Sequence, residues 1–544
     1  MGHAHDYAAA IMRRGRVPME PVDFVPDWPD GPRKGKFYPG AESFPLPPGD
    51  VPPDATVEAA LSGGQRPGTA VPFTLPLLGG MLLDSYGRTG RRLGVQANSD
   101  LGSLPSYADA NWSRGSASGG GLYPVSVYWV CGPSGPLTPG VYHYATTHHA
   151  MRRLLAGDVS GEVRAALAGH EQAARTDQFL VLGVKFWQNA FKYNSFCMHA
   201  VSMDVGAALQ TWRLWARARG AVAEPALWFD EERLGRLLGV DILEEGVFAV
   251  VPLTWEGPTS AAGAPDAPVP PVAAPAGPPS RRPPAPRVRR REQERSRRVI
   301  AFDAVRRVQA AMVAGAAQRP GPGALAEAAP HPAPDSGGAV PLPAPLPLPM
   351  TVRAALRRRR SSFGRFDAQR AMTAAQLGTL LAASADCPLG EPTVDAPPLA
   401  KLYVFVNHVD GIAPGAYAYI PAAHALRPVT SGPPGRFLQD SYFLSNYNLE
   451  QAGAVVVPAV RTTAVLDALG DRGYRVVNAG VGATAQTFYT TAAALGLGSG
   501  VALGFDNVVY VEELGLEGSD EAPLLIMLVG HERPDPADFR YELV

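Results

Sequence analysis

The sequence predicts an α+β protein that contains the same unit twice, each copy built on a mixed sheet flanked by helices. Residues 140–154 read GVYHYATTHHAMRRL and residues 415–429 read GAYAYIPAAHALRPV, so a glycine, two tyrosines, a histidine and an arginine recur at an offset of 275. Helical and strand-like segments also intermix without a strict β-α-β alternation, which is typical of the α+β class. The chain is therefore expected to fold as an intramolecular pseudo-dimer.

A second, longer register supports the duplication. At an offset of 276, residues 205–239 align without a gap to residues 481–515, and Gly206 then matches Gly482 while Gln210 matches Gln486. Solenoid repeats have periods of roughly 20–50 residues, so a period this long indicates a duplicated domain. Differences between the two copies should then show how they divide the work.

Each copy is expected to contain a helix, three strands, a long helix and a final strand, in that order. The expected elements are residues 73–85, 125–130, 141–144, 179–184, 203–219 and 247–253 in the first copy, and 373–385, 402–406, 416–419, 454–460, 479–495 and 524–529 in the second. The long helix is apolar nearly all round, which predicts burial. In a pseudo-dimer it belongs at the interface between the copies.

Composition shifts divide the chain into four parts. Residues 1–70 are rich in Pro, Gly and charge and are expected to form an extended arm, and residues 71–256 form the first unit. Residues 257–350 are rich in Pro and Ala, as expected of a semi-rigid polyproline linker. Residues 351–544 form the second unit.

The linker also contains a basic segment. Residues 281–307 hold eleven arginines, and helical character is expected over residues 287–313. A charge run of this kind is consistent with a solvated helix face. The alternative is a docking surface for an anionic partner or a peptide leader.

The composition narrows the class of protein. Lys and Arg total 49 against 50 Asp and Glu, so the formal net charge of −1 gives no global attraction to nucleic acid or acidic lipid. The three cysteines are scattered without the spacing of a metal site or a disulfide framework. No signal peptide or membrane span is expected, and a cytoplasmic location follows from these patterns.

A basic segment opens the second unit. Residues 357–366 read RRRRSSFGRF, and clustered guanidinium groups beside hydroxyls are suitable donors for a phosphate. The alternative is a solvated basic helix end. The aligned residues 60–66 read ALSGGQR, so the first unit lacks this set of donors.

A glycine-rich loop is specific to the first unit. Residues 114–124 read RGSASGGGLYP and lead into the strand 125–130, so backbone N–H groups could approach a flat ligand or an anion closely. A flexible loop tip is the alternative. The corresponding stretch of the second unit, PTVDAPPLAK, contains no glycine.

A third asymmetry precedes the long helix. Lys192 and Tyr193 of the first unit are replaced by Ala468 and Leu469 in the second. A partly buried lysine beside a tyrosine could transfer a proton, because burial lowers a lysine pKa toward neutrality. Two ordinary surface residues are the alternative.

The long helix of the second unit ends in a glycine-rich stretch, GLGSG at residues 496–500. It follows a helix instead of opening one, which argues against a dinucleotide-binding loop. A helix-capping turn whose backbone faces a cofactor is expected instead.

Taken together, these motifs resemble the flavin-dependent, nitroreductase-fold peptide dehydrogenases of the SagB type, which oxidise thiazolines and oxazolines to thiazoles and oxazoles in ribosomal peptides. The resemblance is carried by SGGGLYP at residues 118–124, KY at 192–193, RRSSFGRF at 359–366 and ALGLGSG at 494–500. It covers both units and most of the N-terminal arm, and it leaves the Pro-rich linker outside.

The resemblance implies an FMN site shared by the two units. It assigns phosphate binding to Arg359, Arg360 and Ser361, and contact with the flavin ring to the glycine loop, while the helix-capping turn is expected to face a cofactor through its backbone. The loop residues are Ser118, Gly119 and Gly120, and those of the turn are Gly498 and Ser499. It assigns azoline oxidation to Lys192 and Tyr193, while the arginines that often follow this pair are absent here.

The expected function is an FMN-dependent dehydrogenase acting on the azolines of a precursor peptide, as a monomer, with a cyclodehydratase as a possible partner. Two alternatives stay open. One is a flavin oxidoreductase for another peptide side chain or for a nitro or enone compound. The other is a flavin-free scaffold that binds the peptide and its cyclising enzyme.

Overall fold

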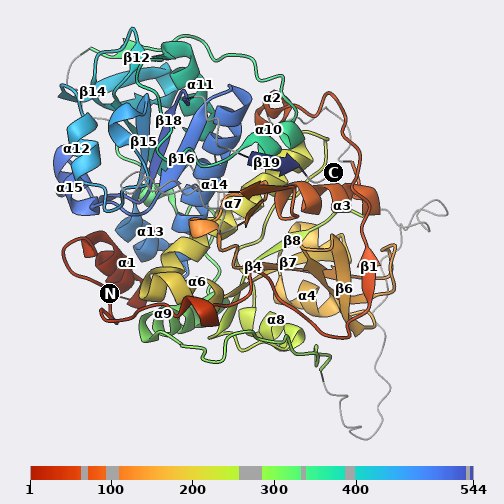
Figure 1. The fold of residues 1–544 in the computed structure, drawn as a ribbon. Coiled ribbons are helices and arrows are strands. Elements are labelled where there is room, and N and C mark those ends of the chain that lie inside the picture. The colour runs from red at the N-terminus through yellow and green to blue at the C-terminus, as the bar shows by residue number, and fades with distance from the viewer. Residues whose placement is uncertain are drawn as a thin grey trace, which may run out of the picture.

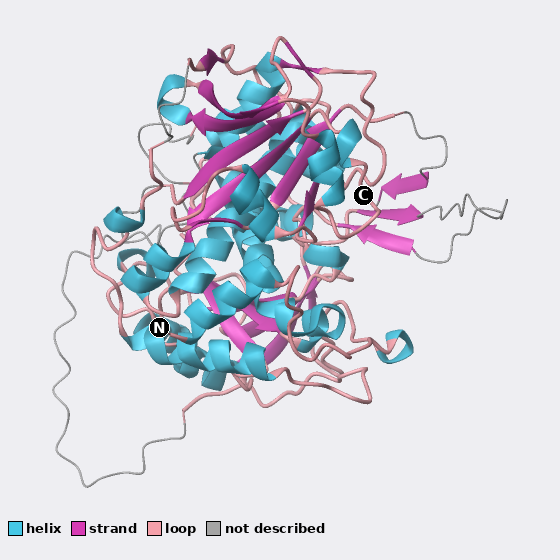
Figure 2. Cartoon of the chain, turned by 90° about the vertical axis from the view of Figure 1, so that its left-hand side faces the viewer, coloured by secondary structure: helices cyan, strands magenta, loops and turns pink. Residues whose placement is uncertain are grey.

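The computed structural model describes residues 2–62, 71–93, 110–255, 285–332, 338–385, 387, 398–533 and 539–542. Two large sheets lie apart, with helices between them (Figures 1 and 2). The small sheet made by β2 (Gly90–Leu93), β3 (Ala110–Ser113) and β19 (Phe539–Glu542) projects from one side in Figure 2. In the described part of the chain, no helix combines the length and the apolar character needed to cross a membrane.

The two large sheets share one strand order. The first contains β1 (Ser43–Pro45), β4 (Val125–Cys131), β5 (Gly140–Ala145), β6 (Ala150–Ala156), β7 (Gln178–Lys185) and β8 (Glu245–Pro252). The second contains β9 (Val340–Pro341), β11 (Ala400–Val406), β13 (Gly415–Ile420), β14 (Ala425–Ser431), β15 (Ala454–Arg461), β16 (Gly498–Ala502), β17 (Glu521–Pro523) and β18 (Ile526–Gly530). The order β6-β5-β4-β7-β8 of the first sheet recurs as β14-β13-β11-β15-β18 in the second.

The expected mixed sheet was wrong, because each described pairing within the two large sheets is antiparallel. A short parallel pairing joins β10 (Met372–Thr373) to β12 (Val409–Asp410), outside both sheets. The turns after β5 and β13 are short, so β6 and β14 fold back directly beside the preceding strands. Sequence analysis missed these two return strands.

Helices cover the sheets and fill the space between them. They are α1 (His3–Arg13), α2 (Val57–Leu61), α3 (Leu75–Ser85), α4 (Ser160–Ala166), α5 (Glu171–Ala174), α6 (Trp187–Tyr193), α7 (Cys197–Arg217), α8 (Glu231–Leu238), α9 (Asp303–Ala314), α10 (Val352–Arg358), α11 (Ala374–Ala385), α12 (Gly435–Asp440), α13 (Thr462–Leu469), α14 (Gly473–Ala494) and α15 (Asn507–Glu513). The long helices α7 and α14 are buried along nearly their whole length and pack on each other, as their apolar sequences predicted.

Small residues allow α7 and α14 to approach closely. A Cβ placed on Gly206 would collide with the backbone of Ala479, and one on Gly482 would collide with the backbone of Met203. These two contacts are related by the offset of 276, since residue 203 corresponds to 479 and residue 206 to 482. Such reciprocal contacts are those of a self-complementary two-fold interface.

The N-terminal segment is not wholly extended. It begins with α1, whose Tyr7 and Ile11 are buried in the main core. The N–H of Ala4 donates to Asp471 Oδ1 at 2.7 Å, which ties this helix to the second unit just before α14. Alanines and a period of three to four between apolar positions favour the helix.

The basic segment of the linker is not helical before residue 303, contrary to expectation. Residues 285–302 are irregular, and α9 begins at Asp303. Adjacent arginines repel one another along a helix. Several backbone N–H groups are also bonded to other segments: that of Val288 donates to Leu237 O and that of Gln293 to Phe37 O, both at 2.8 Å.

We predict that Gly206→Ala destabilises the protein by at least 1–3 kcal/mol, roughly the cost of overpacking a tight core, because the helices must separate. Gly480→Ala is the matched control. Gly480 lies in α14 with open space where its Cβ would stand, so the change should be neutral or stabilise by up to about 1 kcal/mol. Urea unfolding measures both, and equal effects would contradict the close crossing.

Candidate functional site

The glycine loop of the first unit is held by a buried carboxylate. Ser118 Oγ donates to Asp204 Oδ2 at 2.6 Å, and the N–H of Gly119 donates to Asp204 Oδ1 at 2.8 Å. The same Ser118 oxygen accepts the N–H of Tyr123 at 2.8 Å. Asp204 lies on α7 next to the crossing with α14, so the interface helix fixes the loop.

Lys192 and Tyr193 end helix α6 and lie directly against this loop. The Lys192 ammonium is 5.1 Å from the centre of the Tyr193 ring. Gly120 has a φ of +59°, and a Cβ there would stand 2.8 Å from Lys192 Nζ and 2.5 Å from the Tyr193 hydroxyl. Glycine is thus required at this position for both its backbone angle and its lack of a side chain.

Burial sets the protonation of these groups. It lowers the pKa of Lys192, and it raises the pKa of Tyr193 to about 12, with a further contribution from the charge of Asp204. Burial also raises the pKa of Asp204 to about 7, although the bonds from Ser118 and Gly119 partly offset it. The neutral amine that can accept a proton is therefore more populated for Lys192 than for a free lysine, while the tyrosine keeps its proton at neutral pH.

The serines of the basic segment form a second cluster in the other unit. The N–H of Ser362 donates to Ser499 O at 2.9 Å, and the N–H of Ser499 donates to Ser362 Oγ at 2.9 Å. Ser361 Oγ lies 3.1 Å from the hydroxyl of Tyr489, which comes from α14. Ser361 and Ser362 of the basic segment therefore lie beside Ser499 of the 496–500 stretch.

The stretch at residues 496–500 differs from the expected turn. Gly496 caps α14 with a φ of +76°, but Gly498 and Ser499 already belong to strand β16. A Cβ on Gly498 would collide with Glu532 and approach Ser362 Oγ at 2.8 Å. Gly498 is therefore needed so that β16 can pack against the basic segment.

Arg359 and Gln486 join the two clusters across the units. Arg359 donates from Nε to Gly115 O and from Nη2 to Arg114 O, both at 2.8 Å. Gln486, on α14, accepts the N–H of Ala117 at 2.9 Å and donates to Gly115 O at 3.2 Å. The second unit thus holds the start of the glycine loop while the first unit holds its centre.

Arg360 is engaged within its own unit. Its Nη2 lies 3.0 Å from Glu532 Oε2, and both side chains are about a quarter exposed. Burial opposes ionisation of Glu532, but the bond from Ser362 and the charge of Arg360 hold its pKa below the usual value. An anion bound here would share Arg360 with this carboxylate.

The second unit also lends apolar side chains to the neighbourhood of the lysine and tyrosine. Burial, and next the charge of Tyr193, raise the pKa of Tyr442. Phe443 and Leu444 follow Tyr442 and are about half exposed, as is Phe363 of the basic segment. The ring centre of Phe363 lies 4.9 Å from that of Tyr447, with the two rings tilted by 39°, and the Tyr447 ring lies over Gly500.

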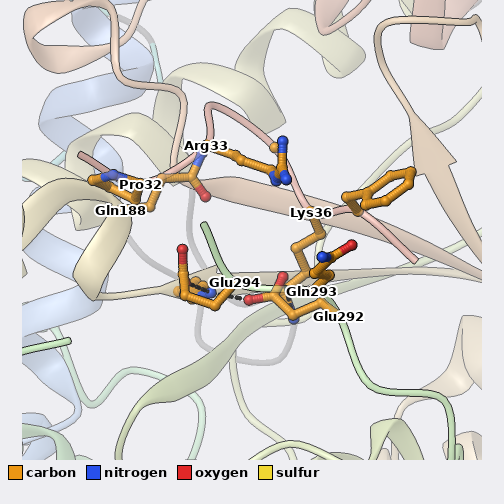
Figure 3. A pocket seen from close by; sticks show the side chains of 10 residues that line it. Pro32, Arg33, Lys36, Gln188, Glu292, Gln293 and Glu294 are labelled. Atoms are coloured by element: carbon orange, nitrogen blue, oxygen red, sulfur yellow. Dashed lines mark hydrogen bonds and ion pairs between the residues drawn. The ribbon is translucent and has the colours of Figure 1, made fainter. Parts of the chain in front are cut away.

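The region formed by the residues that align with this site at the internal offset is partly outside the described residues. Those positions are residues 63–66 of the segment aligned with the arginines, and residues 393–396 of the segment aligned with the glycine loop. The aligned Ala468 and Leu469 lie in and at the end of α13 and carry no titratable group. The pocket in Figure 3 is separate from the site, on the seam between the arm and the linker.

Comparison with known proteins agrees with this architecture. Residues 356–531 match the model of the nitroreductase family. A Methanocaldococcus jannaschii protein named "Putative nitroreductase" is 34% identical over 151 residues, which are 26% of this chain and 69% of that protein. The chain belongs to the nitroreductase family. Members of this family are flavin-dependent oxidoreductases that typically bind FMN.

Solved structures support the fold. The crystal structure of a nitroreductase-like protein from Anabaena variabilis aligns with a TM-score of 0.69 at 21% identity, covering 98% of this chain and 100% of that one. A chain of the E. coli microcin synthetase complex with a truncated pro-peptide bound aligns with a TM-score of 0.28 at 19% identity, over 32% of this chain and 70% of that one. The second likeness is too low to bear on function.

The residues present fit the FMN that members of the nitroreductase family typically bind. Arg358 and Arg359 have no carboxylate partner among the described residues, so positive charge is left over beside Ser361. Gly121 has a φ of +63° and open space where a Cβ would stand. An unneutralised cationic cluster suits a phosphate, and a bare backbone suits the approach of a flat ring.

Sequence analysis missed Asp204 and Gln486. The duplication held a signal for the first, because the residue aligned with Asp204 is Gly480 in an otherwise similar helix. A carboxylate that stands alone in an apolar helix, and that is missing from the aligned helix of the other unit, is a candidate site residue. Gln486 gave no such signal, because the aligned residue Gln210 is also a glutamine. In the fold the two amides bond to different partners, Gln210 to Thr487 and Gln486 to Gly115 O.

We predict that Asp204 makes stability fall as the pH rises. Between pH 4 and 7 the folded protein keeps a proton on Asp204 that the unfolded chain releases, so the free energy of unfolding should decline by about 1.4 kcal/mol for each pH unit. The decline should end near pH 7. In Asp204→Asn this contribution disappears, and parallel pH profiles of urea unfolding for the two proteins would contradict the prediction.

Proposed function

We propose that the protein is an FMN-dependent dehydrogenase that oxidises thiazoline and oxazoline rings of a ribosomally made peptide to thiazoles and oxazoles. The observation that carries this proposal is the pair Lys192–Tyr193 packed on Gly120, next to the carboxylate of Asp204. A general base, a neutral hydroxyl and an open glycine backbone then meet at one point. The precursor peptide is the proposed substrate, and a cytoplasmic cyclodehydratase that makes the rings is the proposed partner.

The chemistry requires a proton acceptor in a partly dry site. An azoline ring becomes an azole by losing one hydrogen as a hydride and a second as a proton. FMN, when bound, accepts the hydride and is later reoxidised, with oxygen as the expected oxidant. Lys192 is suited to take the proton, because burial lowers its pKa and so favours the neutral amine that can act as a base. Tyr193 stays protonated and can donate a hydrogen bond that orients the ring.

We further propose that the two units are a fused pseudo-dimer with one composite FMN site. The phosphate would be held by Arg359, Arg360 and Ser361 of the second unit, and the ring would lie over residues 118–121 of the first. The pair Arg359–Gly115 supports this assignment, because it brings the proposed phosphate donors to the proposed ring platform. Gly498 and Ser499 support Ser361 and Ser362 from β16.

The test of the reaction is mass spectrometry of a synthetic azoline peptide incubated with the protein. Loss of two hydrogens per ring is the expected result. A nitro or enone compound reduced in preference to azoline oxidation would replace the proposal by the broader oxidoreductase. A colourless protein that FMN cannot reconstitute would favour the scaffold.

We predict that Lys192→Ala and Tyr193→Phe each lower turnover while FMN stays bound, because the pair serves proton transfer and not cofactor retention. Removing a positioned acid or base costs about 100-fold to 10,000-fold. Stopped-flow reduction of the bound flavin by an azoline peptide, together with the flavin content, measures both effects. Full activity in the double variant would remove these residues from the mechanism.

We predict one FMN per chain. Replacing Arg360 and Ser361 with alanine should release the flavin, since each charge-assisted bond to a phosphate contributes roughly 1.5–3 kcal/mol. In the variant Glu532 also loses its partner and would repel the phosphate. Arg436→Ala, at an exposed site in the same unit, is the control and should keep its flavin. Two flavins per chain, or a yellow half expressed alone, would contradict the composite site.

A further inference from the structure

The arginine-rich segment before α9 is held in place along its length. We name residues 285–300 the basic strap. The N–H of the buried Val288 donates to Leu237 O, and that of Gln293 donates to Phe37 O. A Cβ on Gly239 would collide with the carbonyl of Val288, whereas its counterpart Gly515 in the second unit has open space there. The strap is therefore seated on the first unit and the arm.

Side chains complete this attachment. Lys185 bonds to both Glu292 and Glu294, and Trp187 Nε1 donates to Ser296 Oγ at 2.9 Å. Figure 3 shows Glu292 and Glu294 of the strap facing the arm residue Lys36 across a small pocket. The carboxylates of the strap thus point inward and are neutralised.

The arginines of the strap point outward. Seven of them are exposed, and within the part of the chain that the structure describes none forms an ion pair with a carboxylate: Arg287, Arg289, Arg290, Arg291, Arg295, Arg297 and Arg298. Asp30 is near, but it accepts the backbone N–H groups of Arg297 and Arg298 at 2.7 and 3.0 Å. Those two bonds are the largest causes of the lowered pKa of Asp30, and the charges of Arg297 and Arg295 contribute less. The strap is thus an ordered row of positive charge, near Asp30 but without an ion pair to a carboxylate among the described residues.

We infer that the basic strap is a docking surface for an acidic segment of the peptide substrate. Guanidinium groups bind carboxylates through paired hydrogen bonds, and a fixed backbone presents them without the entropy cost of ordering a tail. The identification of the partner as the substrate rests on the proposed function. The strap adjoins α6 through Trp187, and Lys192 and Tyr193 stand at the other end of that helix. A peptide held on the strap could therefore extend toward the reacting pair.

The charge distribution favours a short acidic peptide over a nucleic acid. The whole chain has a formal net charge of −1, so the positive field is confined to the strap and fades within about 8–10 Å at physiological salt. The nearby aromatic rings are also engaged: Trp28 packs on Phe191 and Arg33 lies over Phe37. Trp28 and Phe37 remain 60% and 42% exposed, so the oligonucleotide arm of the experiment tests whether a single strand stacks on them.

The experiment measures binding of a fluorescein-labelled peptide of alternating Glu and Ser by anisotropy, with the full chain and over a series of salt concentrations. The variants are Arg289→Gln, Arg290→Gln, Arg291→Gln combined, and Arg295→Gln, Arg297→Gln, Arg298→Gln combined. The same two sets changed to Lys preserve the charge. Arg175→Gln with Arg436→Gln, both well exposed, is the matched control. A thymidine oligonucleotide of equal charge is the second probe.

Each Gln set should weaken peptide binding about tenfold, since exposed charge pairs contribute a few-fold each, and higher salt should weaken it further. The Lys sets keep the charge but lose the paired hydrogen bonds, so they should weaken binding less than the Gln sets, and the control should bind as the natural chain does. Equal binding by the Gln sets and the control would overturn the docking surface, and tighter binding of the oligonucleotide would overturn the peptide partner. Because this readout needs no turnover, its failure is distinct from failure of azoline oxidation.

Discussion

The close crossing of α7 and α14 is the contact on which the rest of the molecule depends. Gly206 and Gly482 let each helix touch the backbone of the other, at positions related by the internal duplication. At this distance no larger residue fits, so the two units cannot shift without losing the core between the sheets. Asp204 and Gln486 stand on the same two helices within about one turn of the crossing. The candidate site is therefore located by the interface itself.

A buried charge cluster also holds the two units and the linker together. Glu231 of the first unit bonds to Arg472 and Arg475 of the second, and Gln309 of linker helix α9 joins both Glu231 and Arg475. All four side chains are almost fully buried. Removing one partner from such a cluster costs about 3–5 kcal/mol, because a buried charge is left unpaired. Two units and a linker thus form one body, as a site shared between the units requires.

The two units kept what the fold needs and diverged where chemistry is expected. Tyr128 donates to Glu245 in the first sheet, and Tyr403 donates to Glu521 at the corresponding place in the second. The cation that pairs with each glutamate has different sources: Lys36 comes from the arm, whereas Lys401 lies in the sheet itself. In contrast, Asp204 faces the glycine loop and its counterpart is Gly480. The two units are therefore alike in their buried hydrogen bonds and differ at the candidate site.

The sequence by itself determined the α+β class, the long buried helices and the residue types of the candidate site. Hydrophobic periodicity and a constant offset are properties of the linear chain, and Lys192 and Tyr193 are neighbours in any conformation. Only the tertiary structure decided which groups hold the glycine loop, since Ser118 and Asp204 are 86 residues apart and Ala117 and Gln486 are 369 apart. It also decided that the basic segment is a strap and not a helix. Its backbone groups form hydrogen bonds with segments distant in the sequence, and local helix propensity does not include such contacts.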